Sequence, residues 1–332
     1  MGQTKRTILA VIPVYNDWTA AAMLLDDLDR VDFNGTVHVM FVDDASTDAV
    51  TRPAVKERYA SINEISVLRL NRNLGHQRAS AIGMAYACAT LAFDAMIVMD
   101  ADGEDRPQDI RTLIDTFDEN KGQGVVFAAR RRRTAALSFK LYYLVYLMVS
   151  KILTGFAERV GNFSVLSRAT ASRLVQAPEL LMHYSSTVQK LKIPFHKVKI
   201  DRGKRYHGSS KMGFTGLVMH GLLAIAVHRE RVAIRAFIFC AFSSFLLLAG
   251  IPIVACVRFF TDMAIPGWAT SLTGMLLILL SQLVGLGLFT IFIILGSRSL
   301  MEVVPARDFG LFIEGHETWY HRAANSDIPA VN

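Results

Sequence analysis

With 332 residues, the chain has room for one large domain or two ordinary ones. Its 52% hydrophobic content and mean hydropathy of +0.31 argue against a purely soluble enzyme, and its net charge of +7 favours anionic partners such as phosphorylated substrates or a membrane face. The three cysteines, Cys88, Cys240 and Cys256, lack the CxxC and Cys/His spacings of a zinc site and support no disulfide framework.

Apolar runs alternate with amphipathic segments through the first part of the chain. The runs predict strands at 7–14, 37–42, 65–70, 95–99 and 124–129. The segments between them predict helices at 18–31, 48–60, 75–93 and 107–120. This alternation predicts a Rossmann-like α/β domain with a mainly parallel sheet covered on both faces. No GxGxxG follows the first strand, which argues against a dinucleotide enzyme.

Polar, turn-forming residues follow four of the predicted strands. They stand at 13–16, 43–48, 71–75 and 100–105. Because ligands bind beyond the carboxyl ends of the strands in such sheets, these segments predict a nucleotide site at one edge. The alternative is that they form ordinary turns and helix caps.

Three carboxylates, Asp100, Asp102 and Glu104, occupy alternate positions after the apolar run 95–99. Crowded carboxylates repel one another, and their hard oxygens suit Mg²⁺ or Mn²⁺, which often bind one or two carboxylates together with a substrate's phosphates. The alternative is an acidic turn that caps the following helix, with Pro107 in the first turn.

Four segments are similar to motifs of one enzyme family, in the same order and spacing. They are IPVYN (12–16), VDDASTD (42–48), RNLGHQRASAIGMAYA (72–87) and MDADGEDRP (99–107). Over residues 7–215 the chain resembles the inverting family 2 glycosyltransferases of GT-A fold, and most closely the polyprenyl-phosphate sugar transferases typified by dolichol-phosphate mannose synthase. The resemblance implies transfer of a sugar from a nucleotide-sugar donor.

The resemblance also implies a donor site. Pro13 and Tyr15 would line the base pocket, while Asp44 would hydrogen-bond the base or the ribose and Asp43 would support it. The other donor-binding residues would be Asn16, Asn73, Gly75 and Asp100.

A divalent cation, Mg²⁺ or Mn²⁺, is the implied cofactor. Asp100 would contact both the nucleotide ribose and the metal, and Asp102 would ligate the metal directly. Glu104 would be the third ligand, at a position where many relatives have glutamine. The cation would stabilise the charge that builds on the leaving diphosphate.

At the position where relatives have an aspartate, often assigned as the catalytic base, this chain has Asn162, which cannot take a proton. A phosphate monoester has a second pKa of about 6, so most of it is already a dianionic nucleophile at neutral pH. A strong base is then dispensable, and we expect a polyprenyl phosphate as the acceptor. The alternatives are that Asn162 is a simple turn residue or that the chain is an inactive relative.

Two basic segments supply further candidate residues for catalysis and for phosphate contact. The segment 205–212 is similar to the family's phosphate-contact segment. The resemblance assigns acceptor and phosphate contacts there to Arg205, Ser209, Ser210 and Lys211. The run 130–133 supplies Arg130 and Arg131 as candidate catalytic residues, with a solvated basic face as the alternative.

Apolar stretches dominate the rest of the chain. Residues 138–155 predict a helix too short to span, lying in the membrane interface or, alternatively, buried in a core. Residues 213–235 predict a juxtamembrane amphipathic helix. Residues 236–257 and 269–296 each exceed the roughly 20 residues needed to cross a bilayer, so they predict a transmembrane hairpin over 236–296; a buried hairpin is the alternative.

Charges around the two spans predict their orientation. Arg229, Arg231 and Arg235 precede the first span and Arg298 follows the second. We therefore expect an integral plasma (inner) membrane protein with the catalytic domain, residues 1–212, and both termini in the cytoplasm. The spans contain no Asp, Glu, Lys or Arg, which argues against a transporter.

The parts around the hairpin complete the organisation. Gly285 and Gly287 would allow close helix packing, including packing between the subunits of a homo-oligomer. The cytoplasmic tail, 297–332, is too mixed to form its own domain, so we expect it to pack on the catalytic domain or the interface.

The sequence thus predicts a membrane enzyme that moves a sugar, with inversion, from a nucleotide sugar, UDP in preference to GDP, to a polyprenyl phosphate. One rival is a glycosyltransferase with a hydroxyl acceptor, which would need the base that Asn162 does not provide. Another is a non-catalytic membrane partner that retains the fold. A nucleic-acid binder would fit the positive charge but not the two spans.

Overall fold

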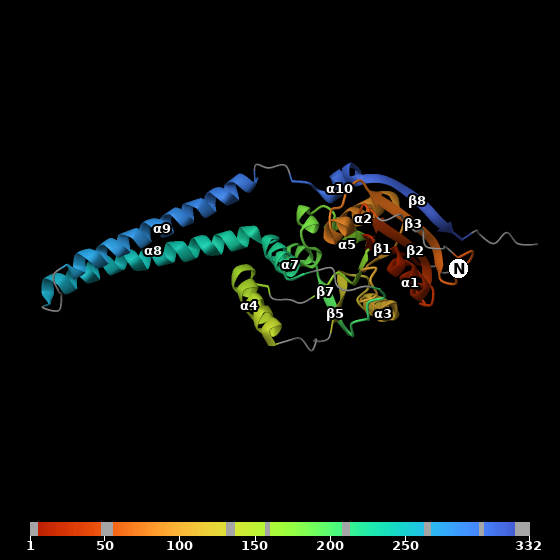
Figure 1. Ribbon diagram of the computed structural model, residues 1–332, viewed down its shortest axis with the longest axis horizontal. Helices are drawn as coiled ribbons and strands as arrows, with labels where there is room; N and C mark the ends of the chain where they lie inside the picture. The colour runs from red at the N-terminus through yellow and green to blue at the C-terminus, as the bar shows by residue number, and fades with distance from the viewer. Residues whose placement is uncertain are drawn as a thin grey trace, which may run out of the picture. The chain divides into compact units, whose positions relative to one another are not determined.

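The computed structural model describes residues 6–47, 56–130, 137–156, 160–207, 213–261, 267–298 and 302–322. The chain forms two compact units, one made of 1–136, 158–227 and 303–332 and the other of 137–157 and 228–302. We call them the sheet unit and the hairpin unit (Figure 1). The sheet unit therefore includes the C-terminal tail, and the helix around 138–155 belongs with the hairpin.

The sheet unit is built on a mixed sheet whose described strands run in the order β7-β5-β6-β4-β1-β2-β3-β8. They are β1 (Arg6–Val14), β2 (Gly35–Asp43), β3 (Ile62–Leu70), β4 (Ala95–Val98), β5 (Val125–Arg130), β6 (Ser164–Ser167), β7 (Phe195–Ile200) and β8 (Ile313–His321). Strands β1 to β5 confirm the five predicted runs. Strand β6 runs antiparallel to both neighbours and β8 to β3, while the other pairs are parallel.

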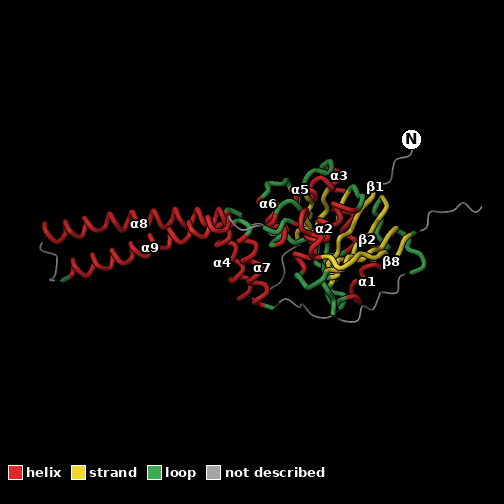
Figure 2. The backbone as a smooth tube through the Cα atoms, turned by 90° about the horizontal axis from the view of Figure 1, so that it is seen from above, coloured by secondary structure: helices red, strands yellow, loops and turns green. Residues whose placement is uncertain are grey.

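Helices cover both faces of this sheet, as Figure 2 shows. Helices α1 (Trp18–Leu28) and α3 (Ile110–Glu119) contribute to the core on one face, and α2 (His76–Thr90), α5 (Arg168–Leu174) and α6 (Tyr184–Lys190) to the core on the other. In α1 the apolar residues recur at helical spacing, so Ala21, Leu24 and Leu28 face the strands together. Helix α2 packs closely, since a Cβ on Gly83 would lie 2.4 Å from a methyl of Val42.

The predicted helix 48–60 is wrong where it can be compared. Residues 48–55 lie outside the described residues, and 56–60 form no helix. Tyr59 is instead buried against Tyr320 of β8, with ring centroids 5.0 Å apart, and its N–H donates to the Tyr320 hydroxyl at 3.3 Å. Contacts with a strand far along the chain override the local helical pattern here.

Strand β8 brings the tail back to the sheet. It pairs antiparallel with β3, and Trp319 lies 5.1 Å from the ring of Trp18 in the core under α1. The chain reaches β8 through the short helices α10 (Pro305–Asp308) and η3 (Phe309–Phe312). The tail therefore packs on the sheet unit rather than forming a domain of its own.

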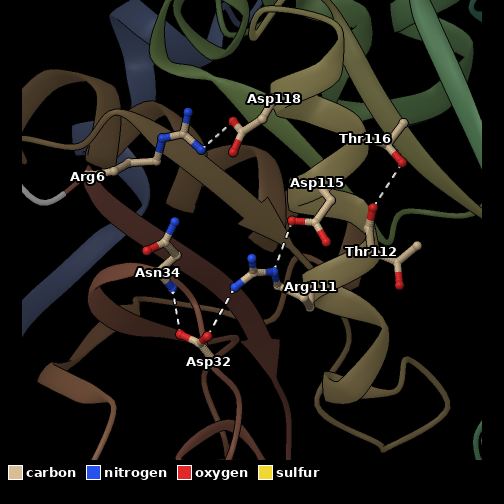
Figure 3. A network of polar contacts seen from close by, with 8 residues as sticks. All are labelled: Arg6, Asp32, Asn34, Arg111, Thr112, Asp115, Thr116 and Asp118. Atoms are coloured by element: carbon tan, nitrogen blue, oxygen red, sulfur yellow. Dashed lines mark hydrogen bonds and ion pairs between the residues drawn. The ribbon is translucent and has the colours of Figure 1, made fainter.

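An ion-pair network ties α3 to the end of the sheet where the strands begin (Figure 3). Arg6, the first residue of β1, pairs with Asp118 of α3 at 2.6 Å. Arg111 pairs with Asp115 of its own helix at 2.9 Å and with Asp32, in the loop before β2, at 3.1 Å. The network lies at the opposite end of the strands from the polar segments that follow them.

The hairpin unit contains α4 (Leu137–Thr154), α8 (Arg229–Phe260) and α9 (Trp268–Arg298), and α8 and α9 run side by side (Figure 1). Among the described residues, α8 and Trp268–Ile293 of α9 are long and apolar enough to cross a membrane, with mean hydropathies of 2.4 and 2.5 in an apolar window of each. Only 11% and 6% of these windows are buried, so the structure does not support the alternative of a buried hairpin.

The helices around the hairpin differ from the predicted ranges. Helix α7 (Phe214–Ala226) ends before His228, and α8 starts at Arg229, so the predicted helix 213–235 is two helices. The side chains of Leu144 and Ile152 in α4 are 62% and 63% exposed, which contradicts the alternative of a buried core helix. Within this unit Arg235 donates to the carbonyl of Ile152 at 2.5 Å, at the end of α4.

Candidate active site

Strand register brings the predicted site segments to one edge of the sheet. Parallel pairing aligns the carboxyl ends of β1 and β2, with Val14 opposite Asp43, and those of β5 and β7, with Arg130 opposite Ile200. Strand β6 runs the other way, so it begins at this edge, with Ser164 opposite Val98 of β4. Strand β4 stands between β1, β2 and β3 on one side and β6, β5 and β7 on the other, and it delivers the acidic loop to the middle of the edge.

Asp44 organises the loop that leads into α2. It is 2% exposed, and its two carboxylate oxygens accept hydrogen bonds from the backbone N–H groups of Leu74 and Gly75 at 2.6 and 2.8 Å. Burial raises the pKa of Asp44, and the two amide hydrogen bonds oppose that rise. Gly75 has φ of +85°, which favours glycine. In the structure, the Asp44 carboxylate therefore holds the segment that contains Asn73 and Gly75. From the sequence, the same carboxylate was predicted to contact the base or the ribose.

Asp43 holds the loop after β2, and Asn16 joins that loop to the loop after β1. Asp43 accepts from the N–H of Ser46 at 3.0 Å, and Asn16 exchanges two hydrogen bonds with Thr47, at 2.8 and 3.0 Å. Pro13 is buried in β1, whereas Tyr15, two residues later, is 40% exposed. Tyr15 is therefore accessible to solvent at the edge.

The acidic loop after β4 is held by hydrogen bonds within the loop and by contacts from the segment after β7. Asp105 is 1% exposed and accepts from the N–H of Asp100 at 3.0 Å. Asp102 accepts from the N–H of Glu104 at 2.9 Å with one oxygen and from Nη2 of Arg205 at 2.6 Å with the other. Glu104 is paired with Arg202. The repulsion among these carboxylates is thus relieved by two arginines of the segment after β7.

Backbone contacts reinforce the joint between these two segments. The N–H of Gly203 donates to the carbonyl of Glu104, and the N–H of Tyr206 to the carbonyl of Asp102, each at 2.9 Å. The Tyr206 ring covers Gly103, where a Cβ would lie 2.6 Å from ring atoms, and its hydroxyl donates to Asp27 at 2.6 Å. Burial and the neighbouring Asp27 carboxylate raise the pKa of Tyr206. The acidic loop and the basic segment 202–206 are therefore joined into one wall.

The carboxylates of this wall provide some, but not all, of the ligands that a divalent cation needs. In the described part of the chain, no group of three or more His, Cys, Asp or Glu side chains is arranged to hold a metal. Glu104 pairs with Arg202 and Asp102 with Arg205, so an arginine engages two of the three predicted ligands. All three carboxylates follow β4 at this edge, and one or two carboxylates suit a cation that takes its other ligands from substrate phosphates and water.

Asn162 lies at the same edge, two residues before Ser164 of β6, as Asp100 lies two residues after Val98 of β4. Its Oδ1 accepts from Nε2 of Gln77 at 3.0 Å, and its carbonyl accepts from the hydroxyl of Ser164 at 2.9 Å. The predicted acceptor-side residue is therefore held between the end of β4 and the start of α2.

Several of these residues were not predicted from the sequence, namely Gln77, Asp105, Arg202 and Tyr206. Their partners lie 85 to 179 residues away for three of them, so local patterns carry no signal for the pairing. Of the predicted basic residues, Arg130 ends β5 and Arg205 contacts Asp102. Arg131, Ser209, Ser210 and Lys211 lie outside the described residues.

The sheet, with mainly parallel strands and with acidic and basic loops at their carboxyl ends, is of the GT-A-like α/β class. Residues 9–175 match the profile of Glycosyl transferase family 2, and the chain belongs to this family. The protein is therefore a glycosyltransferase.

Sequence relatives include an uncharacterized glycosyltransferase of Synechocystis sp., which is 26% identical over 294 residues, or 83% of this chain and 86% of the relative. An undecaprenyl-phosphate 4-deoxy-4-formamido-L-arabinose transferase of Klebsiella pneumoniae is 25% identical over 219 residues, or 64% of each chain. Among solved structures, glucosyl-3-phosphoglycerate synthase of Mycobacterium tuberculosis, in complex with Mn²⁺, UDP and glucosyl-3-phosphoglycerate, matches at a TM-score of 0.46 and 17% identity, over 68% of this chain and 80% of that one.

Proposed function

We propose that the protein transfers a sugar from a nucleotide sugar to a polyprenyl phosphate, with inversion at the anomeric carbon, and yields a polyprenyl-monophosphate sugar. The observation that carries this proposal is the joint between the acidic loop and the basic segment, formed by Asp102 with Arg205 and Glu104 with Arg202. The donor diphosphate and the acceptor phosphate are both anions. This joint offers them carboxylates for a shared cation and guanidinium groups for direct contact.

On the donor side, Tyr15 would stack on the base, and Asp43 and Asp44 hold the loops around it. Asp100 and Asp102 would hold Mg²⁺ or Mn²⁺, which, when bound, stabilises the charge that develops on the leaving diphosphate. We take the donor to be a UDP-sugar in preference to a GDP-sugar.

On the acceptor side, Arg205 would bind the acceptor phosphate, because it ends at the acidic loop where the two substrates meet. The further contacts predicted from the sequence are Arg130, Arg131, Ser209, Ser210 and Lys211. A phosphate monoester is mostly a dianion at neutral pH, so it attacks without a strong base. The presence of an amide at Asn162 is compatible with that chemistry.

A polyprenyl acceptor is supported by the relatives named as undecaprenyl-phosphate sugar transferases and by the two apolar helices. The acceptor's tail stays in the bilayer, so an enzyme anchored by α8 and α9 meets its phosphate at the headgroup plane. The arginines at 229, 231, 235 and 298 favour a cytoplasmic position for the sheet unit in the plasma (inner) membrane.

The test incubates membranes containing the protein with a panel of labelled UDP- and GDP-sugars and a polyprenyl phosphate, in Mg²⁺, Mn²⁺ or EDTA. We expect label in the organic extract with at least one donor, and loss of that label in EDTA or with Asp102→Asn. Absence of extractable product with every donor contradicts the acceptor assignment, and label on a hydroxyl-bearing lipid or glycan supports the hydroxyl-acceptor alternative. Transfer that persists in EDTA contradicts the cation.

A further inference from the structure

The loop after β3, residues 71–75, leads from the sheet to α2 and carries Asn73 and Gly75, two of the predicted donor-binding residues. The end of this loop next to α2 is held by Asp44, whose carboxylate accepts from the N–H groups of Leu74 and Gly75. The end next to β3 is held by a different part of the chain, the C-terminal tail. The loop is therefore attached at both ends.

Asn71 makes the attachment to the tail with two hydrogen-bond donors. Its backbone N–H donates to the carbonyl of Phe312 at 2.9 Å, and its Nδ2 group donates to the carbonyl of Leu311 at 2.8 Å. A backbone carbonyl can only accept, so the side-chain amide of Asn71 has one orientation that satisfies this contact. Two neighbouring carbonyls of η3 thus hold the first residue of the loop, although Leu311 lies 240 residues further along the chain.

The tail segment that makes this contact is packed on the sheet unit. Strand β8 follows η3 directly and pairs with β3, with Ile313 opposite Leu70. Phe309 and Phe312 pack against the core on the α2 face of the sheet, and the guanidinium carbon of Arg72 lies 5.9 Å from the centre of the Phe312 ring. The carbonyls that hold the loop therefore belong to a packed element.

Asp44 connects the loop 71–75 to the rest of the donor side. Strand register aligns the carboxyl ends of β1, β2 and β3 at one edge. The N–H of Asp44 donates to the carbonyl of Val14 at 2.8 Å, while its carboxylate holds the end of the loop next to α2. Tyr15, predicted to line the base pocket, follows Val14 directly, so the loop and this residue are attached to the same aspartate.

We propose that the tail completes the donor site, and that Asn71 is the positioning residue that holds the loop 71–75 in the conformation that binds the nucleotide. This proposal rests on the proposed function and adds a second segment of the chain to its donor side. A loop that is fixed at both ends before the nucleotide arrives loses little further conformational freedom on binding, so less of the contact energy is spent on ordering it. Without the tail contact, the nucleotide itself must order the loop, and its affinity falls.

The decisive variant is Asn71→Leu, which keeps the size of the side chain, adds no charge and removes the donor to Leu311. The purified full-length protein in detergent is titrated with UDP and with GDP in the presence of Mn²⁺, by calorimetry. For whichever nucleotide the wild type binds, we expect the dissociation constant to rise about threefold to tenfold, the effect of losing one neutral hydrogen bond. The KM for the nucleotide sugar should rise by the same factor, while the KM for polyprenyl phosphate stays within about twofold.

Glu317→Gln is the matched control. Glu317 of β8 pairs with Arg69 of β3 at 2.6 Å, so this variant also weakens the attachment of the tail to the sheet, but it leaves the contacts of Asn71 in place. It should leave nucleotide affinity unchanged. Hydrogen exchange gives a second readout, because the amides of Leu74 and Gly75 should exchange faster in Asn71→Leu and at the wild-type rate in Glu317→Gln.

Three results overturn the proposal. They are an unchanged nucleotide affinity in Asn71→Leu, unchanged exchange at Leu74 and Gly75 in that variant, and an equal loss of affinity in Asn71→Leu and Glu317→Gln, which would mean that the tail only stabilises the fold. Failure of the proposed function gives a different result, namely no binding of UDP or GDP by the wild-type protein in Mn²⁺ or Mg²⁺. That result contradicts the donor site and this proposal together, whereas nucleotide binding that does not depend on Asn71 contradicts this proposal alone.

Discussion

Arg205 donates a hydrogen bond to Asp102 at 2.6 Å across 103 residues of sequence, so a guanidinium occupies one oxygen of a carboxylate proposed to hold a cation. In Arg205→Ala that competition disappears. We expect a several-fold higher affinity of the protein for Mn²⁺, measured by the paramagnetic signal of the free ion. Transfer should fall about a hundredfold, since the phosphates lose a guanidinium. Arg111→Ala, at the opposite end of the strands, is the control, and equal Mn²⁺ affinity in all three proteins would contradict the competition.

Asp44→Asn tests the loop before α2. An asparagine must turn its NH2 group toward either Leu74 or Gly75, whose N–H groups now both donate to the carboxylate. One buried donor then loses its acceptor, which costs about 2 kcal/mol of unfolding free energy. Denaturant unfolding should report this loss, together with a higher KM for the nucleotide sugar. Asp32→Asn, in the exposed loop before β2, should change neither quantity by a comparable amount.

Gly103→Ala tests the wall between the acidic loop and the basic segment. Gly103 has φ of +84°, and an added methyl would lie 2.6 Å from the Tyr206 ring. The strain and the displaced ring should cost about 1 to 3 kcal/mol and lower transfer more than tenfold. Gly310→Ala meets nothing within 4 Å and serves as the control. Activity equal to that of Gly310→Ala would show that the wall tolerates movement.

We expect the free energy of unfolding to fall on acidification because of His220 in α7. Burial, and then the neighbouring His76, lower the pKa of His220 below its usual 6.5. The unfolded chain therefore binds more protons than the folded one as the pH falls through about 6.5, and stability is lost until the folded pKa is passed. Replacing His220 with Asn should flatten the dependence of unfolding free energy on pH between about 7 and 5. An equally steep dependence in the variant would assign it to other groups.

The sequence predicted the five strands that contain the longer apolar runs and missed β6, β7 and β8. Strands β1 to β5 lie in the middle of the sheet or are covered on both faces, so their runs are visible. Strand β7 alternates with Lys197 and Lys199, and β8 carries Glu314 and Glu317 at an edge, so neither reads as a strand locally. Helix prediction failed at 56–60 for a related reason, because Tyr59 packs on β8.

The sequence predicted which site residues follow the strand ends, but not which side chains contact them. Asp44 and Asp100 were found because they follow apolar runs that had to be parallel strands. The partner of Glu104 could not be foreseen, since Arg202 reaches it only through the register of β7 on β5. Gln77 lies within the motif segment 72–87, but nothing in the sequence indicated that its side chain would contact Asn162, 85 residues away.

The return of β8 to the sheet constrains the topology of the whole chain. Strands made before α8 and a strand made after α9 pair within one sheet, so both ends of the helical hairpin must emerge on one side of any membrane that α8 and α9 cross. If the chain crossed the membrane an odd number of times between β7 and β8, β8 would lie on the opposite side of the membrane from β3 and could not pair with it. The sheet is therefore completed only after the second crossing has been made, which ties final folding of the enzyme to its insertion.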